Sequence, residues 1–165
     1  MTPAQAGVLR AGLSPDILTV GVFVDETPEN IAALVRSGII DAVQLHGDRS
    51  EAYIKKIRAL AARPVVIIKA VSVTKAGDVQ KQADTTADYL LFDNRGGGTG
   101  QSFDWDLIGE AKKPFFLAGG LNIENIGSAI AKTNPFAVDI SSGVETDGLK
   151  DSGKIMSIVR KVRNE

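Results

Sequence analysis

Short apolar runs recur along the chain at intervals of roughly 23 residues. Each run is followed by a polar or glycine-rich junction and then by a helical pattern, an alternation typical of a parallel sheet with crossover helices. Nearly every position within the runs is apolar, as expected of strands covered on both faces. The six predicted strands are Val20–Val24, Ala42–Leu45, Val65–Ala70, Tyr89–Phe92, Phe115–Ala118 and Ala137–Ile140.

Capping residues and prolines mark where the intervening helices begin. Thr27 followed by Pro28 predicts a helix that runs to about Ser37 and stops at Gly38, because threonine caps the first turn and proline fits its first position. Five further helices are predicted, each with its own opening residue: 4–11 after Thr2, 54–61 after Asp48 or Ser50, 104–111 from Asp104, 123–132 after Asn122, and 155–162 after Asp151.

Two architectures fit this order of elements. A closed (β/α)8 barrel, the TIM fold, has eight units and about 200 residues or more. Six strands preceded by one helix would then make an incomplete barrel that lacks a strand, a helix and a strand at its amino end, roughly 40 to 50 residues. A doubly wound sheet of six strands would lack nothing. In either case we expect residues 1–165 to form a single domain.

The loops after the last three predicted strands are rich in glycine. Asp93 is followed by a segment, residues 94–103, with four glycines, which is neither a P-loop nor a dinucleotide fingerprint. The segments Ala118–Asn122 and Asp139–Glu145 follow the last two strands. Barrel enzymes often bind phosphate on these two loops with backbone N–H groups. The loops therefore favour the barrel and predict a phosphate site, with ordinary turns as the alternative.

Polar side chains stand at or near the carboxyl ends of the predicted strands, where barrel active sites are built: Gln44, His46, Lys69, Asp93 and Asp139. His46 could be a structural hydrogen-bonding residue or a catalyst. Lys69 could be a nucleophile if burial lowered its pKa, or the partner of a carboxylate. Asp93 adjoins the glycine-rich loop and is the best candidate for proton transfer, although such an aspartate often caps the next helix.

Composition narrows the function further. The chain carries 19 basic and 20 acidic residues and has a net charge of -1, which argues against nucleic-acid and membrane-surface binding. Aromatic residues make up only 5%, so base-stacking surfaces are not expected. The absence of cysteine excludes disulfides. No apolar run reaches the ~20 residues of a spanning helix and no signal peptide is apparent, so we expect a cytoplasmic protein.

Five segments together resemble the phosphoribosylanthranilate isomerase family of the tryptophan pathway, in order and over nearly the whole chain. They are Gly21–Val24, Val43–Gly47, Phe92-Asp93 with Gly97–Trp105, Leu117–Leu121 and Val138–Glu145. The resemblance implies the Amadori rearrangement of N-(5-phosphoribosyl)anthranilate to its 1-deoxyribulose 5-phosphate form. It also implies a phosphorylated small molecule as substrate, and neither a metal nor an organic cofactor.

The resemblance also implies roles for particular residues. Asp93 is the general acid that protonates the ring oxygen of the sugar. The phosphate is held by backbone amides around Ala118, Gly119, Ser142 and Gly143, with the loop from Gly98 to Gly100 closing nearby. His46 and Asp139 line the pocket beside the ribose and the anthranilate.

The chain departs from this family in one respect. Family members open with a strand that ends in a general-base cysteine and place an arginine for the anthranilate carboxylate after the second strand, and neither is found here. We therefore expect an amino-terminally truncated isomerase that is poorly catalytic alone, with open barrel edges at residues 20–24 and 137–140 that invite self-association.

Two alternatives remain open. One is a non-catalytic phosphate-binding or assembly remnant of the same barrel. The other is a barrel isomerase of another sugar phosphate, against which the segment Phe103-Asp104-Trp105 argues.

Overall fold

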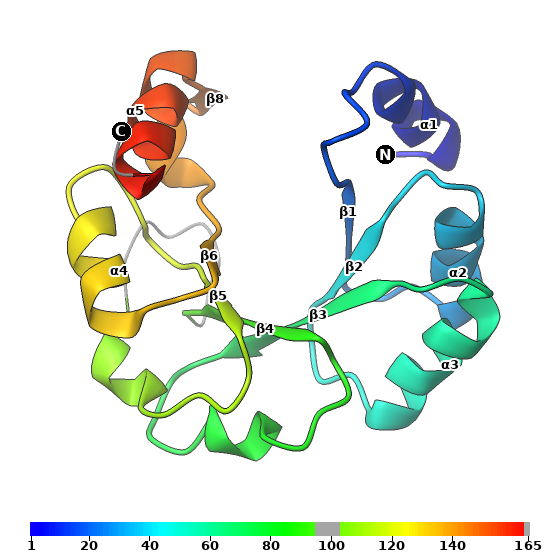
Figure 1. The fold of residues 1–165 in the computed structure, drawn as a ribbon, viewed down its shortest axis with the longest axis horizontal. Coiled ribbons are helices and arrows are strands. Elements are labelled where there is room, and N and C mark those ends of the chain that lie inside the picture. The colour runs from blue at the N-terminus through cyan, green and yellow to red at the C-terminus, as the bar shows by residue number, and fades with distance from the viewer. Residues whose placement is uncertain (95–102, 164–165) are drawn as a thin grey trace. The chain divides into compact units, whose positions relative to one another are not determined.

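The computed structural model describes residues 1–94 and 103–163 and has an α/β fold with six strands in one sheet (Figure 1). The strands follow one another in the order β1-β2-β3-β4-β5-β6, and the pairs β1–β2, β2–β3, β4–β5 and β5–β6 are parallel. A doubly wound sheet reverses its strand order at a switch point. This order has no reversal, so the doubly wound alternative is wrong and the winding is that of a barrel.

The fold divides into two compact units, Met1–Ala70 with Thr85–Tyr89, and Val71–Asp84 with Leu90–Glu165. A single domain over residues 1–165 stays a prediction. The first unit contains α1 (Pro3–Ala11), β1 (Val20–Phe23), α2 (Pro28–Arg36), β2 (Ala42–Leu45), α3 (Glu51–Ala61) and most of β3 (Val66–Ser72).

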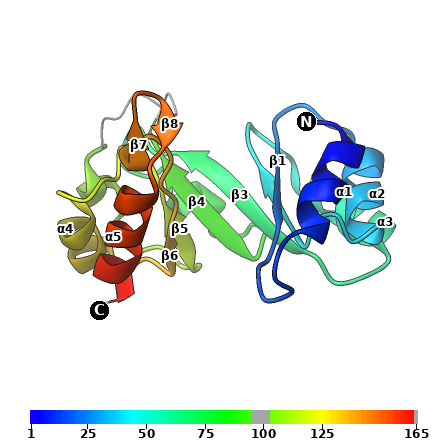
Figure 2. The ribbon, with the colours of Figure 1, turned by 90° about the horizontal axis from the view of Figure 1, so that it is seen from above.

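The second unit holds the remaining elements. Its strands are β4 (Tyr89–Asp93), β5 (Phe115–Leu117), β6 (Ala137–Val138), β7 (Glu145–Thr146) and β8 (Leu149–Lys150), of which β7 and β8 form a separate antiparallel hairpin. Its helices are α4 (Ile126–Thr133) and α5 (Ser152–Arg163), with 3-10 turns η1 (Gln80–Gln82), η2 (Trp105–Ile108) and η3 (Ser142–Val144). Figure 2 shows the hairpin beside the start of α5.

The core of the first unit lies between the sheet and helices α2 and α3. Ile31, Val35, Ile54 and Ile57 of the helices are fully buried against apolar strand residues such as Val43. Alternation along a strand turns successive side chains to opposite faces. Position 44, between two buried residues of this core, therefore faces the other side of the sheet, where functional groups of a barrel are found.

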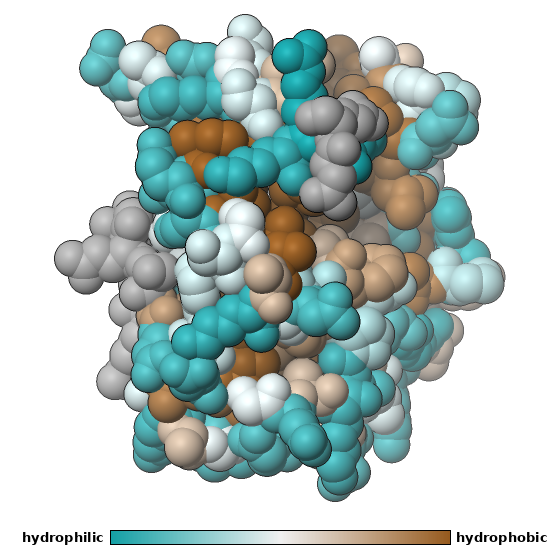
Figure 3. Space-filling view, turned by 60° about the vertical axis from the view of Figure 1, so that its left-hand side comes forward, coloured by the Kyte–Doolittle hydropathy of each residue, from teal (hydrophilic) through white to brown (hydrophobic). Residues whose placement is uncertain are grey.

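The core of the second unit is built in the same way. Phe92 and Leu117 of the strands and Ile126 of α4 are fully buried, and the rings of Phe92 and Phe115 lie 4.8 Å apart. An apolar cleft of about 450 Å³ lies against α5, with residues of β6 and η3 in its walls. Figure 3, which brings the side that carries α4 and α5 forward, shows apolar surface between polar side chains.

Most predicted helix starts are confirmed by their capping hydrogen bonds. The hydroxyls of Thr27 and Ser50 accept bonds from the N–H groups of Asn30 and Tyr53, and Asp151 accepts one from the N–H of Lys154. The helix predicted after Asp104 is only a 3-10 turn.

The start predicted at Asn122 is wrong, because α4 begins at Ile126. The Asn122 side chain instead accepts bonds from the N–H groups of Glu124 and Asn125, which makes a turn before the helix.

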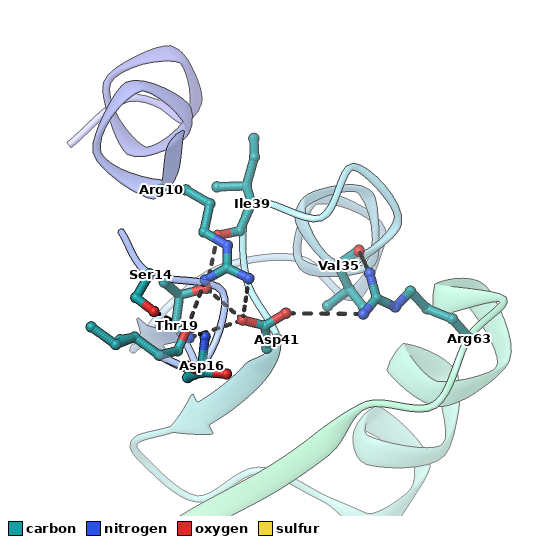
Figure 4. Close-up of polar contacts among 9 residues, drawn as sticks. Arg10, Ser14, Asp16, Thr19, Val35, Ile39, Asp41 and Arg63 are labelled. Carbon is teal, nitrogen blue, oxygen red and sulfur yellow. Dashed lines mark hydrogen bonds and ion pairs between the residues drawn. The ribbon is translucent and has the colours of Figure 1, made fainter. Parts of the chain in front are cut away.

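A polar cluster around Asp41 ties α1 to the strands of the first unit (Figure 4). The Asp41 carboxylate accepts bonds from the N–H and hydroxyl of Thr19, and Arg10 reaches it at 3.2 Å. Arg10 also donates to the carbonyl of Ile17 at 2.7 Å, and Arg63 lies 4.0 Å from Asp41 on its other side. The bond from the Thr19 N–H, above all, holds the pKa of Asp41 below its usual range.

Of the two roles that the sequence leaves open for Lys69, the structure supports the partner of a carboxylate. It is buried on β3, and its Nζ lies 4.0 Å from Oε1 of Glu51 at the start of α3. Burial of Glu51 alone would raise the pKa of its carboxyl, but hydrogen bonds from Thr85 and Thr86 outweigh it and lower that pKa to about 2. Lys69 therefore faces a charged carboxylate on the helix side of the sheet.

Candidate active site

A polar cavity of about 150 Å³ opens where three strands of the second unit end. Asp93 comes from the end of β4, and the other walls come from the loops after β5 and β6. The carboxyl ends of neighbouring parallel strands meet at one edge of a sheet, which is where barrel enzymes place their active sites. The lining residues are Asp93, Ala118, Gly119, Gly120, Leu121, Asp139, Ser141 and Ser142.

Asp93 is held in place from both its backbone and its side chain. Its carbonyl accepts a bond from the N–H of Val73 at 2.9 Å, which fixes the end of β4. Its Oδ1 accepts a bond from the N–H of Asn94 at 2.7 Å. The carboxylate is half-buried and lines the cavity, so Asp93 is oriented toward the space that a ligand would occupy.

Gly119 lies directly against this carboxylate. Its φ of +82° suits glycine, and a Cβ built on it would lie 2.7 Å from Oδ1 of Asp93. The loop after β5 therefore approaches Asp93 as closely as it does only because residue 119 has no side chain.

The loops after β5 and β6 pack backbone against backbone. A Cβ built on Gly143 would lie 1.9 Å from the carbonyl oxygen of Leu121, a distance no real contact shows. Asn125 also holds the loop after β5, because its Nδ2 donates to the carbonyl of Gly120 at 2.9 Å. The two loops thus form one rigid wall of the cavity.

Four backbone N–H groups at this wall are free to bind a ligand. Within residues 1–94 and 103–163, the N–H groups of Gly119, Gly120, Ser142 and Gly143 donate no hydrogen bond. Gly119, Gly120 and Ser142 are half-buried and line the cavity, and Gly143 follows Ser142 directly in the chain. A cluster of unused backbone donors at a small cavity is the arrangement that an anion such as phosphate fills.

Ala118 and Asp139 line the cavity as expected, but the Ala118 amide is already used. It donates to the carbonyl of Phe92 at 2.8 Å within the sheet, so Ala118 lines the cavity with its surface while its neighbour Gly119 offers the unused N–H group. The N–H of Asp139 likewise donates to the carbonyl of Leu117 at 2.9 Å. Asp139 lines the cavity as well.

His46 belongs to the first unit, at the end of β2, where its Nε2 lies 2.7 Å from Nε2 of Gln44. Because Nε2 of Gln44 can only donate, this contact requires Nε2 of His46 to accept, which favours the tautomer with its proton on Nδ1. Gly98 and Gly100 lie outside the described residues.

The β7–β8 hairpin next to the cavity is the feature that the sequence prediction missed. Asp147 and Gly148 form its turn with φ of +52° and +76°. An Asp-Gly pair between two short strands is a strong signal for such a turn. The Asp147-Gly148 pair is visible in the sequence, although the segment after β6 also fits a phosphate loop.

In the described part of the chain, no group of three or more His, Asp or Glu side chains gathers that could hold a metal ion. Within the same residues, no helix is long and apolar enough to span a membrane.

Comparison with known proteins identifies the family. The family model described as N-(5'phosphoribosyl)anthranilate (PRA) isomerase matches residues 2–161. The N-(5'-phosphoribosyl)anthranilate isomerase of Endomicrobium trichonymphae is 47% identical over 159 residues, 94% of this chain and 77% of the relative. That of Clostridium acetobutylicum is 45% identical over 96% of this chain and 79% of the relative.

Solved structures agree with the sequence relatives. The crystal structure of phosphoribosyl anthranilate isomerase from Thermotoga maritima has a TM-score of 0.85 and 37% identity, covering 100% of this chain and 82% of that one. A second isomerase structure, in complex with reduced 1-(o-carboxyphenylamino)-1-deoxyribulose 5-phosphate, has a TM-score of 0.79 and 34% identity, covering 100% and 81%. The expected TIM-barrel fold class is confirmed, and this chain belongs to the N-(5'-phosphoribosyl)anthranilate isomerase family.

Proposed function

We propose that this chain rearranges N-(5'-phosphoribosyl)anthranilate to 1-(2-carboxyphenylamino)-1-deoxyribulose 5-phosphate, a step of tryptophan biosynthesis, with Asp93 as general acid. One observation carries this proposal: the oriented carboxylate of Asp93 lines one cavity with Gly119, Gly120 and Ser142, whose backbone N–H groups donate no hydrogen bond among the described residues. A phosphorylated sugar needs both, an anion site for one end and a proton donor for the other.

The phosphate end of the substrate fits the wall made by the two glycine loops. The N–H groups of Gly119, Gly120, Ser142 and Gly143 supply the donors there. The cavity of about 150 Å³ has room for a phosphate group. The sugar would then extend from this wall toward Asp93, with Asp139 beside it.

The chemistry requires a proton at the ring oxygen and the loss of one from C2'. Asp93 gives its proton to the ring oxygen as the C1'–O4' bond breaks, and the lone pair of the anthranilate nitrogen forms the C=N bond of a Schiff base. A base then takes the proton from C2', and the electron pair forms the C1'=C2' bond of an enolamine. Tautomerisation to the ketone returns a proton to C1', so no atom is gained or lost.

The base for the second step is the weak point of this chain. The family resemblance assigns it to a cysteine, and the 165 residues contain none. Removal of a general base costs a factor of roughly 100 to 10,000 in rate. We therefore propose that this chain by itself binds the substrate through its phosphate but turns it over slowly.

We test this with binding and turnover measured on the same sample. The reduced product analogue should bind in titration calorimetry, its dephosphorylated form should bind far more weakly, and fluorescence of the substrate should decay slowly. A peptide spanning the part of the Thermotoga maritima relative that this chain does not cover, 18% of that chain (100% minus 82%), should raise turnover. Equal binding of both analogues would contradict the proposal. Phosphate-dependent binding that no peptide converts to turnover would favour the non-catalytic alternative.

We also propose that a second copy of this chain pairs with the free edge of β1. This strand has a strand partner on one side only among the described residues. The segment from Ile17 to Val24 has no charged residue and no proline, the usual protections of an edge strand. Val20, Val22 and Val24 are 43%, 58% and 57% exposed. The same edge on two copies can pair across a twofold axis without any other partner.

Association should therefore depend on concentration and disappear when the edge is charged. Light scattering over a dilution series should show a mass that rises from 17.4 kDa toward twice that value. The Val22→Lys variant should stay at the monomer mass, because a charge facing a paired edge is unfavourable. Val8→Lys charges another exposed valine, on α1, and should still associate. A constant monomer mass in the wild type, or equal masses in both variants, would refute this proposal.

A further inference from the structure

Lys150 joins the β7–β8 hairpin to the loop that lines the phosphate cavity. Its Nζ donates to the carbonyl of Ser141 at 2.9 Å and to the hydroxyl of Ser141 at 3.0 Å, and it forms an ion pair with Glu145. An ammonium group has three protons to donate. All three are engaged by these contacts, so Lys150 has none left for a phosphate.

Lys150 holds Ser141, and the position of Ser141 affects the direction of the next two N–H groups, those of Ser142 and Gly143. Ser141 and Ser142 line the cavity, and the unused N–H groups of Ser142 and Gly143 belong to the two residues that follow Ser141. The η3 turn that begins at Ser142 has no side-chain cap of its own. Within the described residues, the two hydrogen bonds from Lys150 to Ser141 thus hold the residue that precedes this turn.

The hairpin is in turn anchored to the start of α5. The N–H of Asp151 donates to the carbonyl of Val144 at 2.8 Å, and the hydroxyl of Thr146 donates to the Asp151 carboxylate at 2.8 Å. Lys154 donates to the carbonyl of Glu145 at 2.6 Å. Lys150 therefore extends from a strand that is held at both ends, and it can transmit that rigidity to Ser141.

We propose that Lys150 is a positioning residue for phosphate recognition, which acts through Ser141 and leaves direct contact with the ligand to the backbone N–H groups. This inference rests on the phosphate site of the proposed function. It assigns to the hairpin the task of keeping the N–H groups of Ser142 and Gly143 aimed into the cavity before the ligand arrives. The loop then loses less conformational entropy when the ligand binds.

The test compares Lys150→Met with Lys150→Arg and with the control Lys112→Met, which removes one positive charge from an exposed site in the same unit. Lys150→Met should raise the Kd of the reduced phosphorylated analogue about tenfold, because the N–H groups of Ser142 and Gly143 lose the support that aligns them, at a cost comparable to one hydrogen bond to a charged group. The Kd of the dephosphorylated analogue should stay unchanged. Lys150→Arg should recover part of the affinity, and Lys112→Met should match the wild type.

Amide NMR spectra distinguish a loss of loop positioning from a general destabilisation of the fold. In Lys150→Met the resonances of Ser142 and Gly143 should shift in the free protein, while those of the first unit stay in place. A direct attraction between Lys150 and phosphate makes the opposite prediction for Glu145→Gln, which frees the ammonium group and should then tighten binding. Tighter binding by Glu145→Gln would overturn the proposal.

The remaining outcomes are equally decisive. Unchanged affinity of Lys150→Met for the phosphorylated analogue would overturn the proposal, and so would an equal loss of affinity for both analogues. If the wild-type chain itself fails to distinguish the two analogues, the phosphate site of the proposed function fails instead. That result is separate, because it is read from the wild type alone.

Discussion

Asp93→Asn should reduce isomerase turnover by a factor of about 100 to 10,000, the usual contribution of a general acid. Asparagine has the same shape, and its Oδ1 can still accept the bond from the N–H of Asn94 that orients the side chain. What it lacks is the proton for the ring oxygen of the sugar. The Kd of the reduced product analogue should therefore change little while the rate collapses. We would measure both, with and without the complementing peptide, so that turnover is high enough to show the loss.

Asp84→Asn is the matched control for this experiment, because Asp84 is an exposed aspartate in the same unit. It should leave both turnover and binding at the wild-type level. A rate for Asp93→Asn within a few fold of the wild type would remove Asp93 from the role of acid. A comparable loss of binding would instead mean that the carboxylate holds the substrate.

Gly143→Ala should abolish most of the affinity for phosphorylated ligands. Its methyl group would meet the Leu121 carbonyl oxygen at 1.9 Å, so the two loops that form the wall must separate. Forcing a methyl group into a packed contact costs about 1 to 3 kcal/mol. The separation of the loops also moves the N–H groups of Ser142 and Gly143 away from those of Gly119 and Gly120. We expect the Kd of the phosphorylated analogue to rise by roughly 100-fold, from the loss of two N–H donors to an anion.

Gly7→Ala adds the same methyl group at a helical position of α1, where no atom outside the neighbouring backbone of the helix itself lies within 4 Å of the new carbon. This variant should bind like the wild type and unfold at the same or a slightly higher temperature, since alanine favours a helix over glycine. Titration calorimetry and a thermal melt on both variants separate the two effects. Wild-type affinity in Gly143→Ala would contradict the packing of the two loops on which the phosphate site depends.

Most of the fold followed from local patterns. The predicted strand at residues 42–45 has the bounds that the structure shows, and the run at 20–24 differs from β1 by one residue. Such runs are informative because a strand buried on both faces must be apolar throughout. The order of the strands could not be read in this way. It depends on which strands pair, and six runs of similar composition are compatible with either winding until the pairing is known.

The candidate site was predictable in its location and not in its contacts. Asp93 and the loops after β5 and β6 were expected at one edge of the sheet, because parallel strands bring their carboxyl ends together. The contact between Gly143 and Leu121 joins residues that are 22 positions apart in the sequence (143 minus 121). The engagement of the Ala118 amide by Phe92 likewise depends on strand register. No local pattern encodes either one.

Lys69 and Lys150 illustrate where the sequence by itself stops. The sequence alone determined the strand and helix alternation, the glycine loops, Asp93 at a strand end and the family resemblance, because each is written in adjacent or periodic positions. Only the tertiary structure decided that Lys69 faces Glu51 and that Lys150 holds Ser141. A long charged side chain can reach any of several partners, and which one it meets depends on how distant segments pack together.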